Sequence, residues 1–331
     1  MDQMSEVDAV PALPALGAVV VGRDEGERLT RSLRSVLGTA SPVVYVDSRS
    51  RDGSAARARR LGVDAVVELA VPPPCTVARA RNAGLAAALA LAPALELVQF
   101  LDADSELFPQ WTAAARAAMA REAGLGAVYG AIHERVPAAS WLSRLYHVEF
   151  AQFRQVPDQC PGMSVMRVAA LRAAGGFVDD LTGYEDREIS TRLHRAGWQV
   201  RQLAADMARH EVRPASLAAW WRRRLQGGAA LGYELSLHPA PPPSVRRAAL
   251  SACAWGAALP VGGVLVAWLN PAVLPLVPLA YAALFTRIAR RVRANGASSR
   301  DAALYAAALV VGKVPEALGF ARFQWARARR R

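Results

Sequence analysis

Between Gly17 and about Arg209, short apolar runs alternate with segments patterned like amphipathic helices. The apolar runs have the length and composition of buried strands. They cover residues 18–22, 43–46, 64–69 and 95–101. The helical pattern is clearest in residues 25–37, where apolar side chains recur every three or four positions. Strands that alternate with helices predict an α/β domain built around a mainly parallel sheet.

Acidic side chains directly follow two of these predicted strands. Asp47 comes after residues 43–46, and Asp102 comes after residues 95–101. Ligands of such sheets bind at the carboxyl ends of the strands, so both acids are expected at the binding edge. Asp102 and Asp104 are two positions apart, which places their carboxylates on one side of an extended chain. Carboxylate oxygens suit Mg²⁺ or Mn²⁺ bridging a diphosphate, while a capped turn is the structural alternative.

Residues 175–198 place two adjacent acids between a glycine-rich turn and a helix. Thr182 and Glu185 have the spacing of a capping box, which predicts that Glu185 caps the helix. Asp186 continues the apolar stripe of Ile189 and Leu193 at its N-terminal end. An acid is costly there unless the stripe opens onto a cleft. Asp186 is therefore expected to be a general base aimed at a bound hydroxyl; a favourable place in the helix dipole is the alternative.

Two further polar features in this region have ordinary structural interpretations. His210 follows the last expected strand, and a single histidine is more often structural than a ligand. Glu188 and Arg192 are four positions apart on the same helix, a spacing that predicts an ion pair on the helix surface.

The positive charge of the chain is concentrated in its tail. The whole chain carries a net charge of +12. Residues 245–331 hold 13 basic residues against Asp301 and Glu316, a net charge of +11, so the rest carries only +1. A basic tail alone would fit nucleic acid. This tail is interleaved with long apolar runs, so an anionic membrane surface is the better partner and no nucleic acid is expected.

The tail also holds the longest uncharged stretch. Residues 248–269 contain no charge over 22 positions and would rise about 33 Å as a helix, enough for a hydrocarbon core of about 30 Å. Residues 271–286 form a second, proline-interrupted run. We expect a membrane hairpin of these two runs, followed by an interfacial amphipathic helix over residues 302–325. A shallow re-entrant hairpin and a buried helical subdomain of a soluble protein are the alternatives.

Several short motifs occur together in a fixed order. They are VVVGRDEGERL, VVYVDSRSRDGS, ARARNAGL, FLDADSEL and GGFVDDLTGYEDREISTRLHRAGW, with a histidine after them. Over about Gly17 to Gly228, this series resembles the family 2 glycosyltransferases, inverting enzymes of the GT-A fold. The resemblance implies a nucleotide-diphospho-sugar transferase with a Rossmann-like, mainly parallel sheet. A dinucleotide enzyme is disfavoured, because Gly17 and Gly22 lack the G-x-G-x-x-G spacing and lie around the first strand.

By this resemblance, Glu25 and Asp47 would contact the nucleotide base or ribose, and Arg81 would lie near the nucleotide. Asp102 would take part in binding the donor diphosphate. One position departs from the family pattern, because Asp24 stands where an asparagine is usual. An aspartate can accept a hydrogen bond there but cannot donate one as an asparagine does.

The resemblance also assigns the metal and the chemistry. Asp102 and Asp104 would hold a divalent ion, Mn²⁺ or Mg²⁺, and His210 matches a position that supplies a further metal ligand in some relatives. Asp186 would be the catalytic base, and Glu185 would support the acceptor site.

These features predict a flexible N-terminus (1–16), a GT-A glycosyltransferase domain (17–237), a proline-rich linker (238–245) and a basic, membrane-associated helical segment (246–331). The expected function is transfer of a sugar from a nucleotide-diphospho-sugar to a lipid-linked or glycan acceptor, for synthesis of a bacterial cell envelope, polysaccharide or glycolipid. Glycosylation of a small lipid or polyprenyl phosphate is an alternative, as is non-enzymatic binding of anionic lipid or nucleic acid by the tail. Arginines flanking the hairpin predict an inner-membrane protein with a cytoplasmic catalytic domain.

Overall fold

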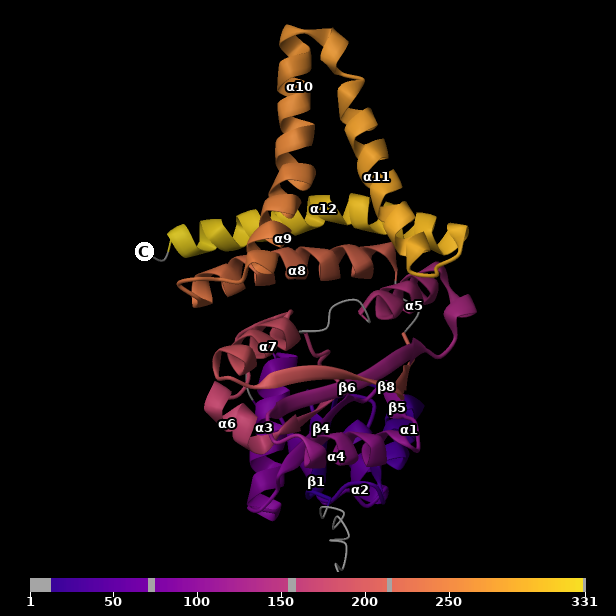
Figure 1. Cartoon of the computed structure of the whole chain (residues 1–331), viewed down its shortest axis with the longest axis vertical. Helices are drawn as coiled ribbons and strands as arrows, with labels where there is room; N and C mark the ends of the chain where they lie inside the picture. The colour runs from indigo at the N-terminus through magenta and orange to yellow at the C-terminus, as the bar shows by residue number, and fades with distance from the viewer. Residues whose placement is uncertain (1–12, 71–74, 154–158, 213–215, 330–331) are drawn as a thin grey trace, which may run out of the picture.

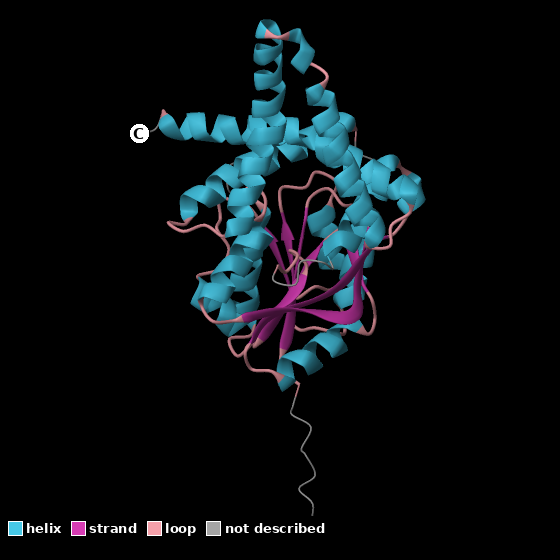
Figure 2. Cartoon of the chain, turned by 45° about the horizontal axis from the view of Figure 1, so that its top comes forward, coloured by secondary structure: helices cyan, strands magenta, loops and turns pink. Residues whose placement is uncertain are grey.

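The computed structural model describes residues 13–70, 75–153, 159–212 and 216–329 (Figure 1). An α/β domain occupies one end of the molecule, and long helices from the C-terminal part of the chain lie over it (Figures 1 and 2). Of the N-terminal segment expected to be flexible, residues 1–12 lie outside the described part. The first strand already begins at Leu16.

The described residues of the α/β domain form one eight-stranded sheet. Its strands are β1 (Leu16–Gly22), β2 (Val43–Asp47), β3 (Ala65–Glu68), β4 (Leu97–Asp102), β5 (Ser105–Leu107), β6 (Leu125–Glu134), β7 (Ser164–Arg167) and β8 (Gln199–His210). Their order across the sheet is β3-β2-β1-β4-β7-β6-β8-β5. Strands β3, β2, β1 and β4 are mutually parallel, and β6 is parallel to β8. Only β7 and β5 run antiparallel to their neighbours, so the predicted mainly parallel sheet is confirmed.

The four strands predicted from apolar runs are β1 to β4. Strands β1, β2 and β4 form the centre of the core, whereas β3 lies at the edge of the sheet and is only partly buried. Val19, Val20, Val44 and Leu101 are 0% exposed. Burial along nearly the whole of β1 and β2 is typical of parallel strands covered on both faces. The helices of this domain are α1 (Glu27–Val36), α2 (Ser54–Arg60), α3 (Val77–Leu91), α4 (Trp111–Arg121), α6 (Val168–Ala174) and α7 (Glu185–Arg195).

The sheet brings the predicted acids to one edge. The strand order reverses between β1 and β4, which is where sheets of this kind bind ligands. On β1, Val21 pairs with Asp102 and Gly22 pairs with Asp47. Asp47 and Asp102 therefore lie on either side of the end of β1, at the carboxyl edge that their positions in the sequence predict.

The remaining helices form a second layer. They are α5 (Trp141–Phe153), α8 (Leu217–Leu237), α9 (Pro243–Cys253), α10 (Leu259–Leu269), α11 (Leu276–Ala294) and α12 (Ser299–Ala328). A π-helical turn (Ala254–Ala258) joins α9 to α10, so one continuous helix runs over Pro243–Leu269. Helices α10 and α11 form a hairpin that projects away from the α/β domain (Figure 1). Helices α8 and α12 lie between this hairpin and the α/β domain (Figure 1).

Helices α8 and α12 pack backbone against backbone. A Cβ atom added to Gly228 of α8 would lie 1.9 Å from the carbonyl oxygen of Glu316 on α12. A Cβ atom added to Gly319 of α12 would lie 1.9 Å from the carbonyl oxygen of Leu225. Only glycine fits at either position, because no Cβ atom tolerates such a distance. The helix pair is therefore fixed in register by small residues on both partners.

The charges inside the apolar pattern of α12 are paired at this interface. Glu316 is 4% exposed. It forms an ion pair with Arg224 of α8, and its second carboxylate oxygen lies 3.0 Å from Nζ of Lys313. A buried carboxylate is tolerated when it is paired and hydrogen-bonded in this way. The ion pair between Arg224 and Glu316 ties α12 to α8, and Lys313 compensates the same carboxylate from within α12.

Within the described residues, three helical segments are long and apolar enough to cross a membrane by length and composition: Pro243–Leu269, Pro271–Ala294 and Ser299–Ala328. Two helices lie close to the limits of the predicted domain ranges. Helix α9 begins at Pro243, inside the predicted linker, because proline is well suited to the first turn of a helix. Helix α8 packs on α12, although it falls within the range predicted for the GT-A domain.

Candidate active site

A buried arginine joins the two acidic motifs. Arg81, on α3, is 2% exposed. Its Nη2 atom lies 3.1 Å from Oδ1 of Asp102, and its Nη1 atom lies 3.1 Å from Oε1 of Glu185. The guanidinium group also lies over the ring of Phe177, 5.6 Å from its centroid. Arg81 thus connects the end of β4 to the start of α7 and compensates a carboxylate on each.

The second acid of the D-x-D motif faces the late histidine. Oδ2 of Asp104 lies 3.3 Å from Nε2 of His210, and Ser105 Oγ donates to Oδ1 of Asp104 over 3.2 Å. The other ring nitrogen of His210, Nδ1, lies 3.4 Å from Oε2 of Glu134. Burial alone would lower the pKa of His210, but the charge of Asp104 and hydrogen bonds to Asp104 and Glu134 outweigh burial and raise it to about 10.

This donor set fits a divalent ion shared with a ligand. Among the described residues, no group of three His, Cys, Asp or Glu side chains could hold a metal unaided. Asp104 and, once its proton is released, His210 would supply two adjacent donors, and Asp102 would add a carboxylate held by Arg81. Glu134 lies behind the histidine, as carboxylates commonly do behind metal-binding histidines. The residues therefore fit a metal whose remaining ligands come from a bound diphosphate.

Glu185 does not cap α7. The helix begins at Glu185, its N-cap residue is Tyr184 with a φ of 59°, and no side chain caps it. The predicted capping box with Thr182 is wrong, because the carboxylate of Glu185 bonds to the guanidinium group of Arg81 instead. The guanidinium group carries a full positive charge and attracts the carboxylate more strongly than a neutral backbone amide does, which explains the preference.

Asp186 faces a cavity, as its place on the apolar stripe predicts. Ile189 and Leu193 of the same stripe are 0% exposed, whereas Asp186 lines the cavity wall. Oδ1 of Asp186 accepts a hydrogen bond from the backbone N–H of Arg187 over 2.8 Å. Burial, together with the negative charge of Glu185, raises the pKa of Asp186 to about 6. A carboxylate of this kind is suited to accept a proton near neutral pH.

The cavity extends from Asp186 to the helices of the second layer. It has a volume of about 430 Å³. Its walls come from α5, from α8, from α12 and from the residues around the start of α7. Its charged lining residues include Glu185, Asp186 and Arg223, and its aromatic and aliphatic lining residues include Tyr146, Tyr305 and Leu309. One continuous space therefore connects the candidate base with α12.

The candidate nucleotide residues lie in two loops that are tied together. Asp47 is 3% exposed and accepts hydrogen bonds from the Tyr45 hydroxyl (3.0 Å) and the Ser50 backbone N–H (2.9 Å). Asp24 has a φ of 54°, and its Oδ1 atom accepts from the backbone N–H of Arg51 over 2.6 Å. This bond needs only an acceptor, so an aspartate is sufficient at this position. Glu25 forms an ion pair with a neighbouring arginine of α1.

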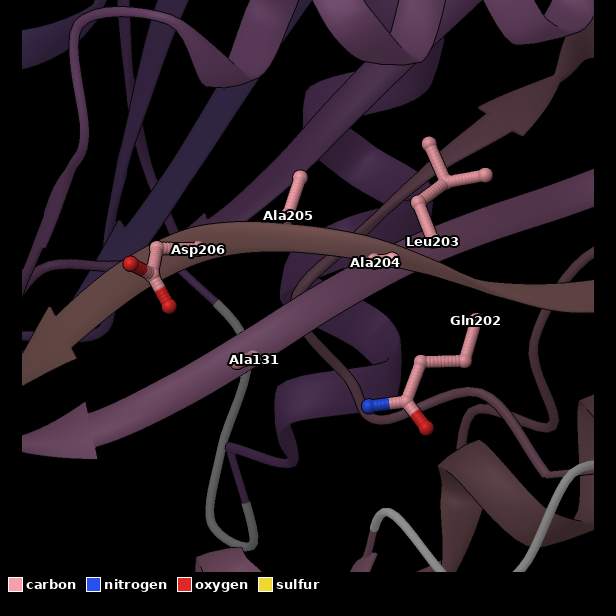
Figure 3. A pocket seen from close by; sticks show the side chains of 6 residues that line it. All are labelled: Ala131, Gln202, Leu203, Ala204, Ala205 and Asp206. Atoms are coloured by element: carbon pink, nitrogen blue, oxygen red, sulfur yellow. The ribbon is translucent and has the colours of Figure 1, made fainter.

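A second hollow, of about 510 Å³, lies on β6 and β8 (Figure 3). It is lined by Ala131 and residues 202–206. In Figure 3, the side chains of Gln202 and Asp206 point to one side of β8, and Leu203 and Ala205 point to the other. Its one carboxylate, Asp206, is paired with His133 at 2.7 Å. It shares no residue with the acidic site and holds no convergent set of polar groups.

Two polar members of the site carry no sequence signal of their own. Glu134 is the last residue of the buried strand β6. It lies beside His210 because β6 pairs with β8, and this pairing cannot be recognised from the sequence around Glu134. Arg223 is one of three consecutive arginines on α8, and its contact with the hydroxyl of Tyr146 (2.5 Å) distinguishes it from Arg222.

Comparisons with known proteins agree with this architecture. The family model described as "Glycosyl transferase family 2" matches residues 18–175. A mannosyltransferase from Pyrobaculum calidifontis, solved in complex with GDP-Man and Mn²⁺, is similar over 96% of this chain and 90% of its own, with a TM-score of 0.57 and 18% identity. GalNAc-T7, solved with UDP, GalNAc and Mn²⁺, is similar over 75% of this chain and 52% of its own, with a TM-score of 0.51 and 14% identity.

No curated protein matches the sequence significantly. At these identities the solved structures establish a shared fold. Residues 18–175 match the model of glycosyl transferase family 2, and the chain has a GT-A α/β domain followed by long apolar helices.

Proposed function

We propose that the protein transfers a sugar, with inversion, from a nucleotide-diphospho-sugar to a lipid-linked acceptor that a membrane delivers. The observation that carries the proposal is the cavity, which is lined both by Asp186 and by Tyr305 and Leu309 of α12. An apolar chain suits the wall formed by α12, and an acceptor hydroxyl suits the carboxylate. The donor would bind at the edge formed by β1, β2 and β4, on the other side of Arg81.

Asp104 and His210 would hold the divalent ion, with Asp102 close to them. Both relatives described above were solved with Mn²⁺, which supports Mn²⁺ or Mg²⁺ here. When bound, the ion supplies positive charge against the diphosphate. Glu25, Asp47 and Arg81 remain the proposed donor-binding residues, and Arg81 adds its own positive charge next to Asp102.

The chain's own residues accept a proton during the reaction and hold the reacting groups in position. Asp186 accepts the proton of the acceptor hydroxyl as the hydroxyl oxygen forms a bond to the anomeric carbon of the donor sugar. The bond from that carbon to the diphosphate oxygen breaks, and the nucleoside diphosphate leaves with the bonding electrons. Attack from the face opposite the leaving group inverts the configuration. Glu185 is fixed by Arg81, which sets the distance between the base and Asp102.

The cavity wall formed by α12 belongs to the same part of the chain that carries most of its positive charge. We propose that the arginines beside the hairpin bind the anionic cytoplasmic surface of the inner membrane, each favouring binding by about 1 kcal/mol. The catalytic domain would then lie in the cytoplasm, with its donor.

The cavity makes a steric prediction. Replacing Ala308 with tryptophan should fill the part of the cavity next to α12. Transfer to a lipid acceptor should then fall more than tenfold, while hydrolysis of the donor by water continues. The matched control is Ala307→Trp, because the neighbouring Ala307 is exposed and does not line the cavity. Both activities are measured on the full-length protein in lipid vesicles. Equal transfer by the two variants would show that the acceptor binds elsewhere.

Glu134 makes a separate prediction about the metal. Replacing Glu134 with glutamine should weaken Mn²⁺ binding by about 10–100-fold, the usual effect of losing a carboxylate behind a metal-binding histidine. Calorimetric titration of Mn²⁺ with the nucleoside diphosphate present measures it directly. An unchanged Mn²⁺ affinity would mean that Glu134 has only a structural role at the end of β6 and that His210 does not bind the metal.

A further inference from the structure

We infer that the hairpin of α10 and α11 enters the lipid bilayer without crossing it, while α12 lies along the boundary between headgroups and hydrocarbon. The inference deepens the membrane placement of the proposed function and rests on it. The partner is a bilayer with anionic headgroups, bound through an apolar hairpin and a basic collar at its base. The protein would then be embedded in one leaflet, with both ends of the hairpin on the same side.

The hairpin is shorter than the hydrocarbon core of a bilayer is thick. The stem of the hairpin is fixed to α12 at Gly256, where an added Cβ atom would lie 2.0 Å from the carbonyl oxygen of Lys313. From Gly256 to Leu269, at the end of α10, the helix rises about 20 Å at 1.5 Å per residue. The hydrocarbon core of a bilayer is about 30 Å thick. A hairpin that starts at the level of α12 therefore ends inside the core.

The returning helix reaches the same level. The hydroxyl of Tyr281 on α11 donates a hydrogen bond to the carbonyl oxygen of Trp255, the residue before Gly256. The two rings also pack together, with centroids 5.8 Å apart. Tryptophan and tyrosine favour the membrane interface, where an apolar ring and a polar group are both satisfied. This pair thus marks the plane in which α12 lies.

Beyond this plane the hairpin is apolar and unpartnered. Trp268 is 91% exposed and Leu269 is 87% exposed at the tip, and Leu276 on the returning helix is 59% exposed. No charged residue occurs over residues 248–286. An apolar surface that projects so far from the molecule indicates contact with lipid.

The charges lie at the other end of the hairpin. Arg246 and Arg247 precede the stem in α9, and Arg287, Arg290 and Arg291 follow it in α11. All five are exposed. A collar of exposed arginines at the base of an apolar hairpin complements anionic headgroups on one side of the membrane.

Helix α12 has one face for the protein and another for lipid. Gly312, Glu316 and Gly319 contact α8. Val311 and Trp325 are 51% and 61% exposed and lie fourteen positions apart, with Leu318, 45% exposed, midway between them. Residues seven apart share a helix face, so these three side chains form one apolar stripe. A helix of this pattern lies in the interface, and crossing the membrane would separate it from α8.

Two native tryptophans test the inference in the full-length protein bound to vesicles of anionic and zwitterionic phospholipids. The vesicles contain lipids brominated either near the headgroup or near the chain ends, and the fluorescence of each tryptophan is obtained by difference from Trp268→Phe and Trp325→Phe. Trp268 should be quenched best by bromine near the chain ends. Trp325, on α12, should be quenched best by bromine near the headgroup.

Each other result overturns the inference. If the hairpin spans the bilayer, Trp268 reaches the far headgroups and is quenched best by shallow bromine. If the hairpin does not insert, neither bromine position quenches Trp268. Binding of a nucleotide-sugar to the same vesicle-bound protein is measured in parallel. Loss of donor binding would count against the proposed function, whereas the quenching depths alone decide how the hairpin sits in the bilayer.

Discussion

Replacing Asp186 with asparagine should lower the turnover of sugar transfer by about 10²–10⁴-fold, the usual effect of losing a general base. The substitution keeps the shape of the side chain and its hydrogen bond from the backbone N–H of Arg187. It removes only the ability to take up the proton of the acceptor. Donor affinity should change little, because the residues proposed to hold the donor lie on the far side of Arg81. Turnover and donor affinity are measured separately on the purified protein.

The matched control is Asp180→Asn. Asp180 lies in the loop before α7, its side chain is 70% exposed, and it makes an ion pair with Arg79 at the surface. Its substitution should leave turnover within a factor of two or so, as surface ion pairs contribute little. Near-normal transfer by Asp186→Asn would remove Asp186 from the mechanism. The variant should also fold normally. The raised pKa of Asp186 means that its negative charge does not stabilise the folded state, so removing the charge should cost no stability.

The same carboxylate predicts the pH dependence of the reaction. Its pKa is raised to about 6, so the basic form predominates at neutral pH and is lost as the pH falls through this value. The rate of transfer at low acceptor concentration should therefore fall about tenfold for each unit below pH 6. Glu185→Gln removes the neighbouring negative charge and should move this midpoint to lower pH. A midpoint that does not respond to Glu185→Gln would belong to another group.

The centre of the fold and its binding edge follow from local patterns in the sequence. The apolar runs that become β1, β2 and β4 are buried almost completely, so hydrophobicity alone identifies them. Asp47 and Asp102 lie at one edge because the chain leaves each parallel strand at its carboxyl end. Strands β6 and β7 are not predicted, because they lie among long helical patterns and β7 has only four residues.

Interactions between distant segments explain where sequence patterns give the wrong answer. Glu185 is spaced to cap its own helix, but Arg81 reaches it from α3. Glu188 and Arg192 are spaced as a surface pair, yet Glu188 is 0% exposed and also lies 3.2 Å from Nε2 of His238, at the end of α8. The contact between Glu188 and His238 helps to join α7 to the end of α8. Spacing along one helix identifies possible partners, and only the packing of other helices decides between them.

The tail shows the same distinction between composition and arrangement. Hydropathy identifies residues 248–269 and the stretch after them as apolar, and both become arms of one hairpin. Composition does not place α12, which is also apolar enough to cross a membrane. Its place beside α8 depends on Gly228 and Gly319, which permit backbone contact, and on the ion pair between Arg224 and Glu316.

Replacing Asp104 with asparagine should weaken Mn²⁺-dependent donor binding by about 100-fold or more. This exceeds the 10–100-fold loss typical of a residue behind a metal ligand, because the substitution removes a donor oxygen and its charge. Asp206→Asn is a close control, since Asp206 also pairs with a histidine, His133, but lies outside the acidic site. Donor affinity is titrated with Mn²⁺ and with EDTA. If Asp104→Asn and EDTA both leave it unchanged, the enzyme is independent of metal, and the D-x-D motif serves only to pair Asp102 with Arg81 and Asp104 with His210.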